Sequence, residues 1–343
     1  MAQDLFETHY FWKTAPVEAF SAFVKTEDYL KLSRRTTSRE KEDETSRPLR
    51  DSSAQVYIHM FSRFARWMAR ENLDVFSITA AHLRAFLEYR ESEEGKPPRA
   101  LTSSIRVRYL RMLERVFAHL QLQPNPARHA AFDVYRTPAA GRDKPKAVLS
   151  PAQHAEFMRA LPSAPPLVEE DMDNPSWKRR RDRAMLAMML GAGLKVSEVI
   201  GIRTASVGVM DTTGSIPVTI TPRSVGGSAK HHETQLRPFA AREVTAWIAE
   251  RKMRNIPGEL LFPASLQGGL LNKATVYRYV KETLARAGID VHRKGGRTLR
   301  NSFAVRELES GGSVELVGQF LGHKKRKSTE KYLLQKPGTT LPD

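Results

Sequence analysis

Residues 52–71 carry apolar side chains at a spacing that places them on one face of a helix. These side chains recur every three or four positions and comprise Val56, Met60, Phe61, Phe64, Trp67 and Met68. Because an α-helix turns once every 3.6 residues, the pattern predicts an amphipathic helix with its aromatic rings in a core. Comparable patterns run over residues 16–32, 79–92 and 100–122, so the first part of the chain is predicted to be helical.

The helix predicted at residues 100–122 also carries a row of arginines, namely Arg106, Arg108, Arg111 and Arg115. The apolar positions between them are predicted to face the core, which leaves the arginines on the other face. Two interpretations of that face are open: its arginines contact phosphate groups, or they form a solvated basic surface with no ligand.

Two polar stretches divide the chain. Residues 33–53 carry almost no apolar side chains and are predicted to form a flexible segment. The second stretch is punctuated by proline and glycine and predicts a linker at residues 136–148. The chain is therefore predicted to have an N-terminal helical domain at residues 1–135 and a second domain at residues 149–343.

The second domain mixes helices with a few strands. Ser150 and Pro151 are typical of an N-cap and a first helical residue, and residues 181–191 and 275–287 also show helical patterns. Two short β-type runs, residues 215–221 and 233–239, flank a Gly-Gly-Ser loop and predict a hairpin. The fold class is therefore mainly α, with a small antiparallel sheet in the C-terminal domain.

The charge balance is strongly basic. Fifty-five lysines and arginines stand against 38 aspartates and glutamates, a formal net charge of +17. Such an excess is expected of a protein that lies along a polyanion, and it predicts that phosphate contacts dominate affinity. The alternative is that the charge only aids solubility.

Several other classes of protein are disfavoured. No apolar run approaches the roughly 20 residues of a spanning helix, and the N-terminus lacks a signal-peptide pattern. The absence of cysteine removes disulfides, zinc-thiolate sites and thiol nucleophiles. His231 and His232 are adjacent, so their side chains do not converge on one ion, and no metal is predicted. A cytoplasmic protein is the simplest interpretation.

Three motifs carry the candidate chemistry. They are GAGLKVSEVIGIR at residues 191–203, RTLRNSFAVRELESGG at residues 297–312, and LGHKKRKSTEKYL at residues 321–333. The last contains His323 and, nine residues later, Tyr332. A phenol is a poor base at neutral pH, but it is a competent nucleophile toward a phosphodiester when cations and hydrogen-bond donors surround the phosphorus.

Together the motifs resemble the three boxes of the tyrosine recombinases, the phage integrase family, in the family's order. The resemblance implies an N-terminal helical core-binding domain of the SAM-like type and a catalytic domain that contains the boxes. It also implies that Arg300 is the second arginine of the family's pair and that His323 donates a hydrogen bond to the same phosphate. Tyr332 is then the nucleophile that forms a 3′-phosphotyrosyl link, with no metal or small-molecule cofactor.

Two further roles follow from the resemblance. Lys230, in the turn of the predicted hairpin, matches a lysine that acts as general acid for the leaving 5′-hydroxyl, or it is one more phosphate contact. Glu198 matches an acidic residue that orients its neighbours, or it is a buried ion-pair partner.

The chain departs from the family pattern at three positions. Lys195 stands where the first box has arginine, and an ammonium cannot hold two phosphate oxygens in a plane as a guanidinium does. Losing such a donor costs on the order of 10² to 10³ in rate, so cleavage is predicted to be slow, whether the lysine is natural or introduced. Arg297 replaces histidine and cannot serve as a general base, and Asn301 replaces a frequent histidine.

The sequence thus predicts a site-specific recombinase of a prokaryotic, nucleoid-associated kind, as found on mobile elements. The resemblance implies double-stranded DNA with a specific site and a homo-tetramer on two such sites, with strand exchange through a Holliday junction. Two alternatives stay open: a type IB topoisomerase that relaxes supercoils, and a catalytically weakened DNA-binding or accessory protein.

Overall fold

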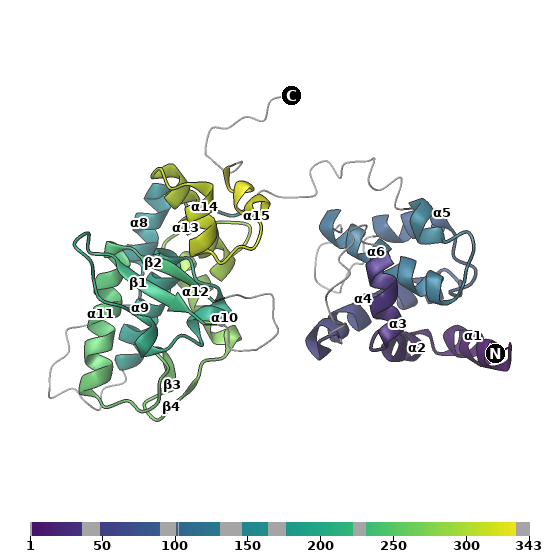
Figure 1. Ribbon diagram of the computed structural model, residues 1–343, viewed down its shortest axis with the longest axis horizontal. Helices are drawn as coiled ribbons and strands as arrows, with labels where there is room; N and C mark the ends of the chain where they lie inside the picture. The colour runs from purple at the N-terminus through teal and green to yellow at the C-terminus, as the bar shows by residue number, and fades with distance from the viewer. Residues whose placement is uncertain are drawn as a thin grey trace. The chain divides into compact units, whose positions relative to one another are not determined.

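The computed structural model describes residues 2–35, 49–89, 101, 103–130, 146–163, 176–221 and 231–333. The chain divides into two compact units, Met1–Lys144 and Pro145–Asp343 (Figure 1). The division falls inside the segment predicted to be a linker, of which residues 146–148 are described. Among the described residues, no helix combines the length and the apolar character that crossing a membrane requires.

The first unit is helical, as the periodicity predicts. Its elements are α1 (Ala2–Thr14), α2 (Pro16–Phe23), α3 (Glu27–Arg35), α4 (Asp51–Arg70), α5 (Ala80–Glu88) and α6 (Ser103–His119). The aromatic side chains form its core: Phe20 stacks on Phe61 with ring centroids 4.3 Å apart, and both rings are buried. The pattern over residues 16–32 is split into α2 and α3 because the Thr26 hydroxyl accepts the Tyr29 N–H and caps a new helix.

The structure corrects two predictions for this unit. The flexible segment predicted at residues 33–53 is helical at both ends, since α3 continues to Arg35 and α4 begins at Asp51. Arginine is a good helix former, and an acidic side chain in the first turn of a helix is favourable. Residues 36–48 lie outside the described part of the chain.

The second correction concerns the arginines of α6. Arg106 and Arg115 are buried, because they lie one turn from Leu110 and Met112 on the inner face. Arg106 pairs with Glu88 at 2.8 Å, and the Arg115 guanidinium lies 4.9 Å from the centroid of the Tyr29 ring. Arg108 and Arg111 are exposed. Half of the predicted basic face therefore holds helices together instead of facing solvent.

The second unit is mainly helical with two small antiparallel hairpins, which confirms the predicted fold class (Figure 1). Its elements are α8 (Pro151–Arg159), α9 (Trp177–Ala192), α10 (Val196–Val199), the 3₁₀ turn η2 (Thr204–Ser206), β1 (Ile216–Ile220), β2 (His232–Leu236), α11 (Pro238–Met253), β3 (Pro263–Ser265), β4 (Gly268–Leu270), α12 (Lys273–Arg286), α13 (Gly296–Glu309), α14 (Val314–Phe320) and α15 (Arg326–Glu330). The hairpin β3–β4 is a feature that the sequence did not predict.

Local signals set the ends of several of these helices. Ser150 and Gln153 form a reciprocal capping box at the start of α8. Gly288 ends the turn after α12 with φ of +63°, a left-handed value that favours glycine. In the predicted hairpin, Ile216 of β1 pairs with Leu236 of β2, and the loop at residues 222–230 lies outside the described residues.

Helix α9 forms the centre of the second unit. It packs against α11, α13 and β2, and its residues 184–190 are almost completely buried. Figure 1 shows α13, α14 and α15 gathered at one end of this unit, with β3 and β4 at the opposite end. The chain leaves α9 at Gly193 and enters α10 directly, which brings the first motif beside α13.

Candidate active site

Arg300 joins three segments of the second unit. Its side chain, on α13, is buried and donates to the Gly193 carbonyl oxygen at 2.8 Å and to the Leu321 carbonyl oxygen. It also lies 3.3 Å from the Glu198 carboxylate. Burial lowers the pKa of the guanidinium, and the charges of Glu198 and Tyr332 oppose that shift. The second and third motifs and the end of α9 are therefore held together at one point.

Gly193 allows this approach because it has no side chain. Its φ is +66°, and a Cβ there would lie 2.4 Å from the Phe303 ring. The ring fills the space where any larger residue would project. The glycine therefore lets α13 pack closely against the end of α9, where its carbonyl meets Arg300.

Gly193→Ala is expected to destabilise the second unit by about 2 kcal/mol, from left-handed backbone strain plus overlap with Phe303. Urea denaturation followed by circular dichroism measures the change. Gly288→Ala is the matched control, since Gly288 has φ of +63° and nothing lies within 4 Å of its Cβ position. It isolates the strain alone, about 1 kcal/mol. Equal losses in both variants would show that Phe303 moves aside at little cost.

Lys195 and Arg300 share one carboxylate. The Lys195 ammonium lies 2.6 Å from one oxygen of Glu198, and the Lys195 backbone N–H donates to the other at 2.8 Å. Burial alone would raise the pKa of Glu198, but the Arg300 charge and the hydrogen bonds from Lys195 together lower it. Glu198 is therefore ionised at neutral pH and holds both cations on one side of the site.

His323 presents a neutral imidazole. Burial, followed by the charges of Arg300, Lys195, Lys146 and His232, lowers the pKa of His323 to about 4. Its Nδ1 lies 2.9 Å from the Thr329 hydroxyl oxygen, so that hydroxyl can donate to Nδ1 and leave the proton on Nε2. A neutral ring in this tautomer is a hydrogen-bond donor at Nε2.

Tyr332 lies in a small apolar cluster with Phe303, Val317 and Leu321, and its side chain is 7% exposed. The hydroxyl donates to Asn301 Oδ1 at 3.2 Å, and the ring lies parallel to that of His323 with centroids 6.3 Å apart. Burial raises the pKa of Tyr332, while the charges of Arg300 and Arg297 lower it. The phenol is therefore protonated at neutral pH, and its ionisation depends on nearby cations.

The structure brings together five of the predicted residues: Lys195, Glu198, Arg300, His323 and Tyr332. Arg297 lies one turn before Arg300 on α13, and its side chain is exposed. Its charge helps to lower the pKa of Tyr332. Lys230 lies outside the described residues, so its predicted role stays a prediction.

Sequence reasoning missed two neighbours of the site. The Lys146 ammonium lies 3.4 Å from the centroid of the Tyr332 ring, and Thr329 contacts His323. Thr329 lies three residues before Tyr332, so its place in the third motif is the signal that could have found it. Lys146 is 186 positions from Tyr332 in a polar stretch, where no local pattern marks it.

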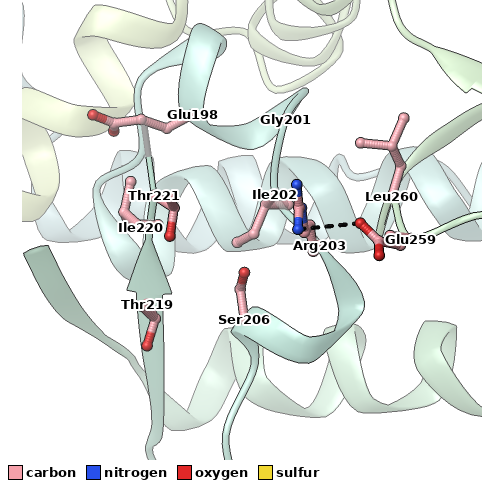
Figure 2. A pocket seen from close by; sticks show the side chains of 10 residues that line it. All are labelled: Glu198, Gly201, Ile202, Arg203, Ser206, Thr219, Ile220, Thr221, Glu259 and Leu260. Carbon is pink, nitrogen blue, oxygen red and sulfur yellow. Dashed lines mark ion pairs between the residues drawn. The ribbon is translucent and has the colours of Figure 1, made fainter. Parts of the chain in front are cut away.

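A pocket of about 450 Å³ adjoins the predicted site at Glu198 (Figure 2). It is bounded by the segment from α10 to η2, by β1 and by Glu259 and Leu260, and Arg203 pairs with Glu259 at 3.2 Å on its wall. Figure 2 shows Glu198 at the margin, with its carboxylate turned away from the other residues that line the pocket. Glu198 is thus shared between the pocket and the predicted site, whereas Lys195, Arg300, His323 and Tyr332 do not line the pocket.

Comparison with known proteins places the chain in a family. The phage integrase family matches residues 166–337, half of the chain. The tyrosine recombinase XerD of Corynebacterium glutamicum is 27% identical over 290 residues, covering 83% of this chain and 88% of that protein. XerC of Serratia marcescens is 27% identical over 318 residues, covering 92% and 89%.

Solved structures show the same fold. The XerH site-specific recombinase, in a post-cleavage complex with a palindromic difH substrate, matches with a TM-score of 0.57 at 17% identity, over 81% of this chain and 75% of that chain. A lambda integrase dimer bound to a COC′ core site matches with a TM-score of 0.56 at 15% identity, over 92% and 98%. With the three motifs gathered at Arg300, these findings show that the chain belongs to the phage integrase family of tyrosine recombinases.

Proposed function

We propose that this protein is a site-specific DNA recombinase in which Tyr332 attacks the scissile phosphodiester. The observation that carries the proposal is the convergence of a phenol, two cations on one carboxylate and a neutral imidazole donor at the end of α13. Family membership supports the general activity, the breaking and rejoining of DNA. Its relatives of the Xer type supply the expectation that the reaction is confined to a specific site.

The chemistry follows from where charge develops. As the Tyr332 oxygen forms a bond to phosphorus, negative charge grows on the nonbridging oxygens, and preorganised donors stabilise it. Arg300 and Lys195 supply positive charge, and His323 supplies the Nε2 proton. Because main-chain carbonyls and Glu198 already hold the cations, little reorganisation is needed when the phosphate arrives.

The first step gives a 3′-phosphotyrosyl link and a free 5′-hydroxyl. The P–O5′ bond breaks as the tyrosyl P–O bond forms, so the bond energy is conserved and the strand can be rejoined without ATP or a metal. The Tyr332 hydroxyl loses its proton to water as its oxygen bonds to phosphorus, and the leaving 5′-oxygen gains one. We assign the proton that the leaving oxygen gains to Lys230, on the family resemblance of its loop. Exchange between two duplexes then proceeds through a Holliday junction, with four copies of the chain on two DNA sites.

Double-stranded DNA is the proposed partner. The similar structures of XerH and lambda integrase are complexes with their own DNA sites, and the net charge of +17 here suits a polyanion. Sequencing the DNA fragments that the purified protein retains from a random duplex library identifies the target site. A suicide duplex with a nick beside that site then traps covalent protein, which denaturing gels detect.

The same assay separates the other candidates. Relaxation of a supercoiled plasmid that lacks the site would favour a type IB topoisomerase. Specific binding with no covalent adduct over long incubation would favour an accessory protein. Lys195 motivates that second outcome, because an ammonium there replaces the planar donor of the family.

A further inference from the structure

The segment that opens the second unit is attached to the helix that carries Arg300. Asn301 Nδ2 donates to the Ala147 carbonyl oxygen at 3.1 Å, and the Leu149 backbone N–H donates to the Ser302 hydroxyl at 2.8 Å. All four residues are buried. Residues 147–149 therefore have a fixed position relative to α13, and Lys146 extends from the end of this fixed segment.

This attachment also orients the Asn301 amide toward the nucleophile. An amide has one donor end and one acceptor end. Because the Ala147 carbonyl accepts from Nδ2, Oδ1 is left facing the Tyr332 hydroxyl, which donates to it at 3.2 Å. The phenol is held at its oxygen by Asn301, and the face of its ring is covered by the Lys146 ammonium at 3.4 Å from the centroid.

We propose that Lys146 is a positioning residue for Tyr332, whose ammonium holds the ring in place and favours the ionised phenol during attack. The proposal rests on the proposed function of Tyr332 as nucleophile. A cation over an aromatic face is attracted by the ring's negative quadrupole, more strongly where water is excluded. Loss of the phenolic proton adds negative charge to the same ring, so the attraction grows as the nucleophile forms. Tyr332 is buried and Lys146 is half-buried, which are the conditions for a large effect.

The surroundings of Lys146 add a pH dependence. Burial, with the charges of Lys331 and Arg297, lowers the pKa of Lys146 to about 8. The groups that face it include the Tyr332 ring and Lys331 at the end of α15, Arg297 on α13, and His323, whose pKa it helps to lower. The ammonium is present below pH 8 and is lost above it. Its contribution to cleavage is therefore expected to fade between pH 7 and 9.

The test uses three variants of the full chain. Lys146→Met removes the cation and keeps an unbranched side chain, while Lys146→Arg keeps a cation over the ring. Lys252→Met, at an exposed position on α11, is the control for the same loss of charge. Adduct formation is measured under single-turnover conditions at saturating protein, on two nicked duplexes that carry the retained site. One has the ordinary scissile phosphodiester, and the other has sulfur in place of the 5′-bridging oxygen, so that its leaving thiolate needs no proton.

Lys146→Met is expected to slow adduct formation on the order of tenfold on both duplexes, with unchanged affinity, because the step affected is nucleophilic attack. Lys146→Arg is expected to recover most of the rate and to keep it at pH 9, and Lys252→Met to match the parent. If Lys146→Met formed adduct at the parental rate on the duplex with the bridging sulfur, the proposal would be overturned, since Lys146 would then be acting as a general acid. Equal rates for the parent and Lys146→Met would also overturn it.

A second measurement needs no DNA. In protein labelled with ¹³C at tyrosine Cζ, the Tyr332 signal is assigned by its absence in Tyr332→Phe, and its shift is followed with pH. Tyr332 titrates at a pH where Lys146 has already lost its proton, so Lys146→Met is expected to leave the pKa of Tyr332 close to that of the parent. Lys146→Arg keeps its charge at that pH and is expected to lower the pKa of Tyr332 below that of both. An arginine variant that titrates like the parent would contradict the proposal, whereas a parent that forms no adduct would count against the proposed function instead.

Discussion

Tyr332→Phe is expected to abolish covalent adduct formation while the variant still binds its duplex. The substitution removes only the hydroxyl, which makes one hydrogen bond, to Asn301. The ring keeps its apolar contacts with Phe303, Val317 and Leu321. The loss of stability should therefore be about 1 kcal/mol. A denaturing gel of the suicide-substrate reaction measures the adduct, and a native gel measures binding.

Tyr277→Phe is the control for this experiment, because Tyr277 is an exposed tyrosine of the same unit and loses the same atom. It is expected to form adduct at the parental rate. If Tyr332→Phe still gave a protein–DNA species that survives denaturation, another residue would be the nucleophile.

Lys195→Arg is expected to raise the rate of adduct formation by about 10²-fold, the scale of one oriented donor in the transition state. Lys195 already lies beside Glu198 and through it beside Arg300, the residue that we propose contacts the phosphate. An arginine of similar reach could keep one N–H on Glu198 and offer others in a planar fork to the phosphate. Because the charge is unchanged, affinity for the duplex should change little.

The gain should appear in the single-turnover rate, since the added interaction strengthens as the phosphorane forms. Lys252→Arg, the same exchange at an exposed position on α11, should leave that rate unchanged. Equal or slower cleavage by Lys195→Arg would show that this site is adapted to lysine, with Glu198 arranged to serve an ammonium.

Sequence reasoning was most successful where the determining interactions are local. The helix at α4 and the N-cap at Ser150 each depend on residues within a few positions of one another, and the hairpin joins two strands that are neighbours along the chain. The grouping of Arg300 with Tyr332 did not follow from local pattern, since their segments meet only in the folded unit. The family resemblance supplied that prediction.

Failures came where a charged side chain has a distant partner. Arg106 and Arg115 were predicted to lie on the surface because arginine is seldom buried. In the structure Arg106 forms an ion pair with Glu88, and Arg115 packs over the Tyr29 ring. Lys146 was missed for the same reason: its partner, the Tyr332 ring, is at the other end of the second unit in sequence. Periodicity reports which face a residue occupies, and it carries no information on which distant group meets it.

The two carbonyl oxygens that receive Arg300 have a consequence for how such a site changes over generations. Those of Gly193 and Leu321 belong to the main chain, which every residue type possesses. Substitution nearby can alter side chains without deleting either acceptor, so long as the chain path survives. Contacts between two side chains have no such safeguard, since the pairing of Lys195 with Glu198 is lost when either residue is replaced. The attachment of Arg300 to these two carbonyls is therefore broken only by replacing Arg300 itself or by changing the fold.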